Sequence, residues 1–217
     1  MSTLHPSPLG GRRPHRDELA DFADAQITDR LPNDTTRYPV RLLIVGINPG
    51  LWTAAVNAPF SHPGNRFWPS LDRAGIVTPQ IDATAGMSDA DEQRLIDAGI
   101  AITNLVPRAT ARADELSRGE LRASVPRLIA LVNDLQPRAV AIVGITAFRT
   151  AFAQPRARLG VQDAALIEGW PAGVPLWVVP QPSGLNAHEN IDTLAEKWRK
   201  VWQDVDGGET AEGNPAD

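Results

Sequence analysis

The sequence predicts an α/β protein: a three-layer α/β/α domain with a mainly parallel, four-stranded central sheet. Short, continuous apolar segments of the kind that parallel sheets bury alternate along the chain with segments of helical periodicity. Strands separated by helices favour a parallel sheet between two helical layers. Because ligands of such sheets bind beyond the carboxyl ends of the strands, a site is expected in the loops that follow them.

Four segments are expected to be the strands. Each is short and largely apolar, as strands covered on both faces are. They are residues 41–47 (RLLIVGI), 100–106 (IAITNLV), 138–144 (RAVAIVG) and 175–180 (PLWVVP).

The helices are indicated by periodicity and by end signals. A glycine closes each of the first two. Ser117 and Glu120 have the spacing of a capping box, which opens a helix that extends to about Asp134. Pro126 is expected to kink this helix or to restart it. The expected helices are residues 65–75, 88–99, 117–134, 146–153 and 189–203.

Composition divides the chain into four parts. Residues 1–14, rich in Pro and Gly, are expected to be a disordered tail. Residues 15–39 are expected to be a helical or irregular N-terminal extension, residues 40–204 the domain itself, and residues 205–217 a disordered acidic tail.

Composition also excludes several classes of protein. No segment is long and apolar enough to span a membrane, and the N-terminus lacks the apolar region of a signal peptide, so a cytoplasmic protein is expected. The absence of cysteine excludes thiolate catalysis, cysteine-ligated zinc and iron–sulfur clusters. The four histidines do not have the spacing of metal ligands, so neither a metal nor a cofactor is expected.

The net charge of −5 argues against a generally basic DNA-binding surface, yet the charge is unevenly distributed. Residues 40–204 carry 16 basic and 16 acidic side chains, so any contact with DNA must come from a local patch. Arg108, Arg112 and Arg118 are candidates for phosphate contacts, although the same arginines are equally consistent with a solvated face.

Three unusual loops follow expected strands: GINPGL (46–51), NLVPRAT (104–110) and PQPSGLN (180–186). GINPGL fits neither the dinucleotide-binding pattern nor a phosphate-binding loop, and by itself it is consistent with a tight turn. Leu185, at the tip of the third loop, is either a wedge for a base stack or an isolated exposed leucine.

The segment NAPFSHPGNRFW (57–68) concentrates aromatic residues on a loop that is stiffened by proline. Phe60 is a candidate for a base-stacking platform, since an aromatic ring on a rigid loop accepts a base on its face. Phe67 and Trp68, at the start of a helix, are expected to pack in the core instead.

In order and spacing, GINPGL, PF-x-HP-x-NRFW, T-x-LV-x-R and PSGL together closely resemble the mismatch-specific uracil-DNA glycosylases, the bacterial relatives of the thymine-DNA glycosylases. The resemblance covers residues 40–203. It implies the uracil-DNA glycosylase-like fold and removal of uracil from DNA by base flipping and hydrolysis. It also implies a monomer that acts on double-stranded DNA with G·U mismatches.

The resemblance further implies roles for individual residues. Asn48 would be the catalytic residue that positions the attacking water. Phe60 would stack on the extruded base, and backbone amides around Ile47 and Phe60 would read the edge of the uracil. The tip formed by residues 184–186 would fill the vacated stack and contact the partner guanine, and Ser183 would contact a phosphate. The residues of the tip are Gly184, Leu185 and Asn186.

The chain departs from the family pattern at several positions. Trp52 stands where small residues are common, and Gln181 stands where the wedge motif usually begins with Asn. Ala187 and His188 occupy a region where Arg often follows the wedge. Asn104 lies where a basic residue can occur, and its neutral amide could hydrogen-bond the target base and broaden the activity.

Three alternatives remain open from the sequence. The first is a broad uracil-DNA glycosylase that also acts on A·U pairs and single strands, with Asn104 as the discriminating feature. The second is a non-catalytic protein that binds damaged bases, because Asn48 carries no acid–base chemistry by itself. The third, a small-molecule hydrolase of the same architecture, lacks a nucleophile–base pair in the sequence.

Overall fold

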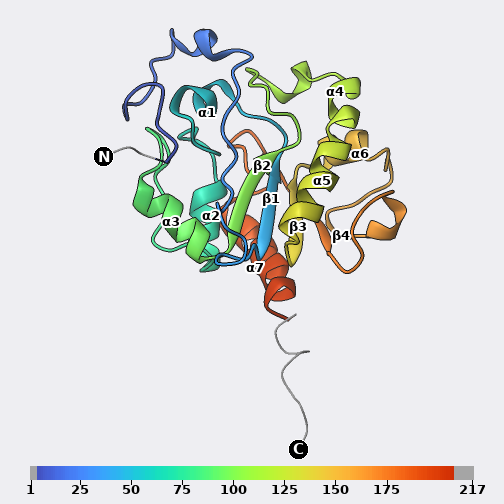
Figure 1. The fold of residues 1–217 in the computed structure, drawn as a ribbon. Helices are drawn as coiled ribbons and strands as arrows, with labels where there is room; N and C mark the ends of the chain where they lie inside the picture. Colours follow the sequence, from blue (N-terminus) through green and yellow to red (C-terminus); the bar gives the residue numbers. More distant parts are fainter. Residues whose placement is uncertain (1–3, 208–217) are drawn as a thin grey trace, which may run out of the picture.

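The computed structural model describes residues 4–207, which fold around one five-stranded sheet with the strand order β2-β1-β3-β5-β4 (Figure 1). Four strands run parallel, and the last strand of the order pairs antiparallel with β5. The strands are β1 (Leu42–Gly46), β2 (Ile100–Asn104), β3 (Ala139–Val143), β4 (Gly160–Gln162) and β5 (Leu176–Val179).

The expected α/β architecture and mainly parallel sheet are confirmed, but the expected number of four strands was wrong. The additional strand, β4, is three residues long and lies at the edge of the sheet. Val161 in its centre is 63% exposed. A short edge strand without a buried apolar segment gives no periodic signal, which explains why the sequence did not predict it.

Helices cover both faces of the sheet, as expected for three layers (Figure 1). Within the described residues, no helix is both long enough and apolar enough to cross a membrane. One layer contains α2 (Phe67–Ala74), α3 (Asp89–Asp97) and α7 (Ile191–Gly207), and the other contains α4 (Arg118–Ala123), α5 (Val125–Leu135) and α6 (Ile145–Ala151).

Four elements were not expected from periodicity because they are very short. They are the helix α1 (Leu51–Val56), which follows β1, and the 3-10 helices η1 (Leu19–Phe22), η2 (Ala113–Glu115) and η3 (Ala164–Leu166).

Alternate residues of β1 enter two separate cores, which explains why the strand is continuously apolar. Leu42 and Ile44 pack with Trp198 of α7, whereas Leu43 packs on the other face with Phe148 of α6. The three strand residues and the two aromatic residues they meet are all fully buried or nearly so. With both faces covered, every position of β1 gains from an apolar residue.

The predicted capping box opens α4. Ser117 Oγ accepts a hydrogen bond from Glu120 N at 3.1 Å, and a Glu120 carboxylate oxygen accepts one from Ser117 N at 2.9 Å. The single helix expected to reach Asp134 is instead two helices, which meet at Ser124. Pro126 stands in the first turn of α5, where its missing N–H costs nothing, so it restarts the helix.

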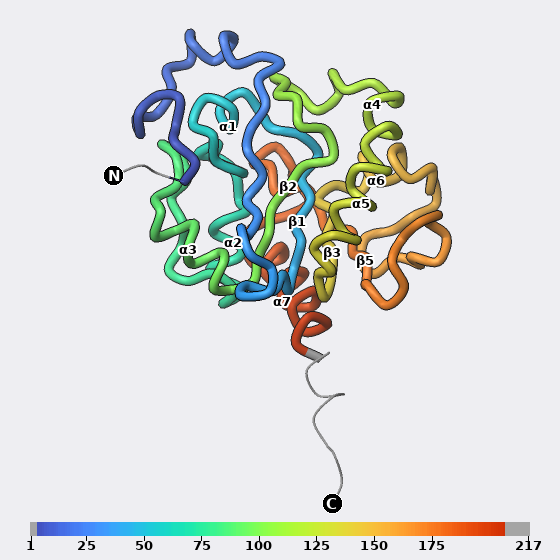
Figure 2. Tube along the Cα trace, viewed as in Figure 1, coloured from blue at the N-terminus to red at the C-terminus, as the bar shows by residue number. Residues whose placement is uncertain are grey.

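The N-terminal extension covers the outer edge of β2. In Figure 2 it passes above the sheet and then descends beside β2. Arg30 N donates to Ile102 O, and Ile102 N donates to Arg30 O, both at 2.8 Å, and a second antiparallel bridge joins Gln26 to Arg108. These bonds satisfy backbone groups that an open sheet edge would leave unpaired.

Residues 4–14, for which composition predicts disorder, make defined contacts. Leu4 N donates to Asp89 Oδ1 at 3.2 Å, and His5 Nδ1 lies 2.7 Å from Glu92 Oε2. At the other end of the chain, α7 continues to Gly207. Residues 1–3 and 208–217, which belong to the two predicted tails, lie outside the described residues.

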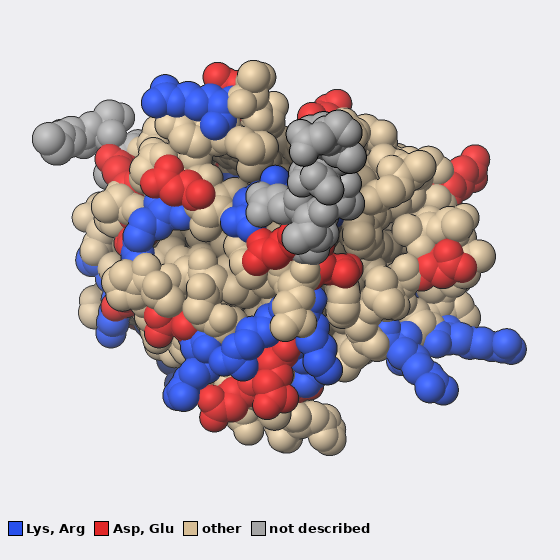
Figure 3. Space-filling view, turned by 90° about the horizontal axis from the view of Figure 1, so that it is seen from below, with Lys and Arg blue, Asp and Glu red and all other residues tan. Residues whose placement is uncertain are grey.

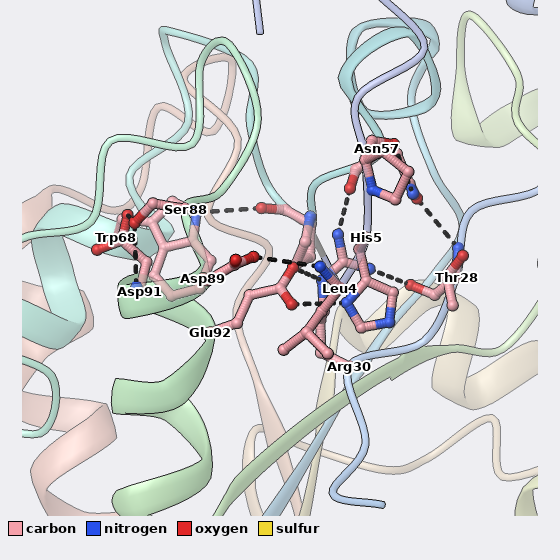
Figure 4. A network of polar contacts seen from close by, with 12 residues as sticks. Leu4, His5, Thr28, Arg30, Asn57, Trp68, Ser88, Asp89, Asp91 and Glu92 are labelled. Atoms are coloured by element: carbon pink, nitrogen blue, oxygen red, sulfur yellow. Dashed lines mark hydrogen bonds and ion pairs between the residues drawn. The ribbon is translucent and has the colours of Figure 1, made fainter. Parts of the chain in front are cut away.

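A buried ion pair joins the extension to α3 (Figure 4). Arg30 Nε lies 3.0 Å from Glu92 Oε1, and the two residues are 5% and 4% exposed. Arg30 also donates to Thr28 O at 2.6 Å and to the carbonyl of Asn57. Burial lowers the pKa of Arg30, while Glu92 opposes this shift. Arg30 therefore ties the extension to α3 through Glu92 and to the end of α1 through the Asn57 carbonyl.

We expect Arg30→Met to lower the free energy of unfolding by about 3 to 5 kcal/mol, because it removes the arginine from the buried Glu92 carboxylate and leaves only the contact with His5. Urea denaturation measures this change. Arg13→Met is the control, since Arg13 and its partner Asp82 are 60% and 68% exposed and such pairs contribute about 1 kcal/mol or less. Equal effects of the two substitutions would contradict the structural role of Arg30.

Candidate active site

A cavity of about 680 Å³ lies beyond the carboxyl ends of β1 and β2. All three loops singled out in the sequence line it, together with the aromatic segment. The predicted site residues that line it are Ile47, Asn48, Phe60, Asn104, Ser183, Gly184 and Leu185; Asn186 adjoins them without lining the cavity.

The carboxamide of Asn48 is held in one orientation. Its Nδ2 donates to Thr110 Oγ1 at 2.7 Å, to Arg108 O at 3.0 Å and to Pro49 O at 3.1 Å. The Thr110 hydroxyl in turn donates to Arg112 O at 2.8 Å, so its oxygen is an acceptor for Asn48. In the described part of the chain, Asn48 Oδ1 accepts no hydrogen bond. That carbonyl oxygen is what Asn48 offers to a molecule in the cavity.

Backbone hydrogen bonds fix the loop that carries Asn48. Beyond the sheet, Val106 N donates to Ile47 O at 3.0 Å and Thr110 N donates to Pro49 O at 3.1 Å. The loop after β2 therefore continues to pair with the loop after β1. Asn48 stands on backbone that is bonded on both sides of it, which makes its position rigid.

Phe60 stacks on a buried ring. The centroids of Phe60 and Phe67 are 3.8 Å apart and the ring planes differ by 22°. Phe67 is fully buried and Trp68 nearly so, which confirms the expectation that these two residues belong to the core. Phe60 has a φ of +54°, a conformation that is rare for a bulky residue and typical of functional loops. One face of its ring is supported by Phe67 while the ring lines the cavity.

Asn104, at the end of β2, lies over Gly46 of β1. A Cβ at position 46 would overlap the Asn104 side-chain oxygen, so only glycine allows this packing. Asn104 is 8% exposed, and in the described residues its side-chain amide forms no hydrogen bond. Its backbone carbonyl accepts a bond from Arg127. A buried amide with open hydrogen-bonding capacity is suited to recognise a polar ligand.

The loop that carries Leu185 is closed by its own hydrogen bonds. Ser183 Oγ accepts from Leu185 N at 3.2 Å, and Ser183 O accepts from Asn186 N at 3.0 Å. Asn186 Nδ2 donates to Gln181 O at 3.0 Å, and its Oδ1 accepts from His188 N at 3.2 Å. Leu185 itself is 96% exposed. The loop thus presents an apolar side chain to solvent on an ordered backbone.

The charges near the cavity are few. His62 is the only ionisable side chain among the described residues that line it. Arg108 is already paired with Asp24 and Glu120, both at 2.8 Å. The hydrogen bond to Asp24, followed by the one to Glu120, raises the pKa of Arg108. Arg112 pairs with Asp114 at 2.6 Å. Two of the three arginines considered for phosphate contacts are therefore engaged within the protein.

The opposite end of the molecule carries both signs of charge. Seen from below, Figure 3 shows Lys and Arg beside Asp and Glu over much of this face. Arg41, which precedes β1, forms an ion pair there with Asp206 of α7. In the chain that the structure describes, no group of three or more His, Asp or Glu is placed to hold a metal ion.

Several residues of the cavity were not predicted. Thr110 lies in a loop that the sequence singled out, but its contact with Asn48 crosses 62 positions of the chain. Leu19 and Ile27 of the N-terminal extension add an apolar wall without any local signal. Trp52, which the sequence had singled out as a departure from the family pattern at the pocket, lines the cavity as well. Its Nε1 donates to Thr84 O at 3.0 Å and its ring meets His62 edge-on at 5.6 Å.

We expect Gly184→Ala to destabilise the protein by about 1 to 3 kcal/mol, because the added Cβ would lie 2.6 Å from Gly64 O, a backbone atom of the neighbouring loop. Thermal unfolding measures this change. Gly119→Ala is the control, since its Cβ would meet only Ser117 Oγ at 3.7 Å. A Gly184→Ala protein as stable as the control would show that the two loops are not in close contact.

A model of the uracil DNA glycosylase superfamily matches residues 33–206, which is most of the chain. The match contains every residue of the cavity except those contributed by the N-terminal extension. The five-stranded, mainly parallel sheet between two helical layers is consistent with the fold of that family. The protein therefore belongs to the uracil-DNA glycosylase superfamily, whose members hydrolyse the N-glycosidic bond of uracil in DNA and so act in base excision repair.

Proposed function

We propose that this member is mismatch-specific and removes uracil from G·U pairs in double-stranded DNA by flipping the nucleotide and hydrolysing its N-glycosidic bond. The observation that carries the proposal is the fixed carboxamide of Asn48, whose free carbonyl oxygen belongs to a cavity without a carboxylate among the described residues. The monomeric state and the cytoplasmic location expected from the sequence stay predictions.

Asn48 acts by positioning water. A carboxamide is essentially non-basic, so its Oδ1 accepts a hydrogen bond from the water without taking the proton. The water attacks the anomeric carbon as the C–N bond to the base breaks. The electron pair of that bond leaves with uracil as an anion, and the proton that the water loses passes to solvent. Charge stabilisation of that anion therefore has to supply most of the rate enhancement. We expect slow turnover from an active site of this kind.

The base is recognised between an aromatic face and polar groups. Phe60, supported from behind by Phe67, stacks on the flipped uracil. The side-chain amide of Asn104 and the backbone amides around Ile47 and Phe60 bind the polar edge of the base. The open hydrogen-bonding capacity of Asn104 supports this assignment.

The preference for mismatches follows from the cost of extrusion. Flipping a base costs a few kcal/mol, and it costs least where pairing is already poor, as in a G·U pair. Leu185 then fills the gap, Ser183 contacts a phosphate near the flipped nucleotide, and the tip formed by residues 184–186 contacts the partner guanine. The exposure of Leu185 on an ordered loop supports the wedge assignment.

One observation favours a broader uracil-DNA glycosylase as the second candidate. The neutral, unpartnered amide of Asn104 can read the base without regard to the opposite strand. Such an enzyme would also act on A·U pairs and single strands. A non-catalytic binding protein would release no base from any of these substrates.

The test is a single-turnover assay on oligonucleotides with uracil opposite G, opposite A and in a single strand, followed by alkaline cleavage of abasic sites. We expect release to be fastest from G·U. Asn48→Ala should lower it by about a hundredfold or more without loss of DNA binding. Asn133→Ala, at an exposed asparagine of α5, is the control. Similar rates on all three substrates would favour the broad enzyme, and unchanged release by Asn48→Ala would refute the catalytic assignment.

Thr110→Val should reduce uracil release by about tenfold, since it removes the acceptor that fixes the Asn48 amide while keeping the shape of the side chain. The melting temperature should change little. Thr150→Val in α6 provides the comparison, because Thr150 Oγ1 bonds only to the carbonyl one turn earlier. Full activity of Thr110→Val would mean that the other two acceptors suffice.

A further inference from the structure

Arg66, at the start of α2, lies against the backbone of the loop that carries Leu185. Its Nη1 donates to Asn186 O at 2.9 Å and to Glu189 O at 2.5 Å, and its Nη2 donates to Gly184 O at 3.1 Å. Its main-chain N donates to Pro182 O at 2.8 Å. A single residue thus binds four carbonyl groups spread along residues 182–189.

In these bonds the guanidinium donates to several backbone carbonyls and does not pair with a carboxylate. In the described residues, no carboxylate forms a salt bridge with Arg66, so its charge is directed only at carbonyl dipoles. Hydrogen bonds from a charged donor are stronger than neutral ones, and the planar group can serve several acceptors at once. The far end of the loop is anchored separately by Lys197, whose Nζ lies 2.8 Å from a Glu189 carboxylate oxygen.

The position of Arg66 in the chain connects two parts of the site. The next residue is Phe67, the ring on which Phe60 stacks. Two residues earlier, Gly64 O lies so close to Gly184 that a Cβ there would be 2.6 Å away. The segment that supports the stacking ring is therefore also the segment that holds the loop of Leu185.

We propose that Arg66 is a positioning residue for the Leu185 wedge. By fixing the backbone on both sides of Leu185, it lets the side chain enter a base stack without first ordering the loop, which would cost conformational entropy. It also keeps the wedge at a constant distance from the Phe60 platform, so that the gap is filled where the base is received. The role of the wedge in this inference rests on the proposed function.

The first test does not depend on catalysis. Amide hydrogen exchange of the full-length protein is compared for wild type, Arg66→Met and Arg66→Lys. Arg66→Met should increase exchange by about tenfold or more at Leu185, Asn186 and His188, while the interior of α7 stays protected. Arg66→Lys, which keeps the charge but loses the fork, should fall between them. Unchanged protection of the loop in Arg66→Met would overturn the proposal.

The second test is a double-mutant cycle in the uracil-release assay. Arg66→Met and Leu185→Ala should each slow release from G·U duplexes by about tenfold, and the double variant should be no slower than either, because both remove the same function. The same variants should lose little activity in releasing uracil from single-stranded DNA. Multiplied losses in the double variant, or equal losses on duplex and single strand, would assign Arg66 a purely structural role.

Arg73→Met in α2 is the matched control, since the Arg73 side chain is 62% exposed and pairs only with exposed Asp192 at 3.5 Å. Absence of uracil release by the wild-type protein would refute the proposed function, whereas the exchange experiment would still decide whether Arg66 orders the loop.

Discussion

The pairing of the loop after β1 with the loop after β2 is the constraint on which the site depends. It extends the parallel ladder past the last regular residues of the two strands, and it brings Thr110 and the Arg108 carbonyl to the amide of Asn48. A carboxamide has two chemically different ends that rotate freely in water. Here the hydrogen-bond partners of the Asn48 side chain among the described residues all lie on the nitrogen side, so the loop pairing determines which end meets the cavity. Backbone geometry thus decides which group Asn48 offers to a molecule in the cavity.

A second constraint is the scarcity of charge. The cavity wall among the described residues has one ionisable side chain, and nearby Arg108 is held by two carboxylates. With so few ionisable groups in the wall, few side-chain charges compete with the fixed dipoles of its amides and carbonyls.

The sequence was sufficient for the parts of the fold that depend on local pattern. The four buried strands and the capping box of Ser117 and Glu120 follow from periodicity and end signals, whereas at Pro126 the sequence left both a kink and a new helical start open. The loops of Asn48, Asn104 and Leu185 could be brought to one cavity because parallel strands end at one edge. Contacts between distant segments could not be predicted from the sequence. Neither the bond from Asn48 to Thr110 nor the bonds from Arg66 to four carbonyls leave a pattern in adjacent residues.

The N-terminal extension shows that the folded domain begins earlier in the chain than the segment matched by the family model. The family match begins at residue 33, whereas the bonds that close the β2 edge and the partner of buried Glu92 are supplied by Arg30. A chain trimmed to the matched residues would therefore present an open strand to other molecules and an isolated carboxylate to an apolar interior. Such a fragment would be prone to self-association through its sheet edge, although every residue assigned to chemistry would still be present.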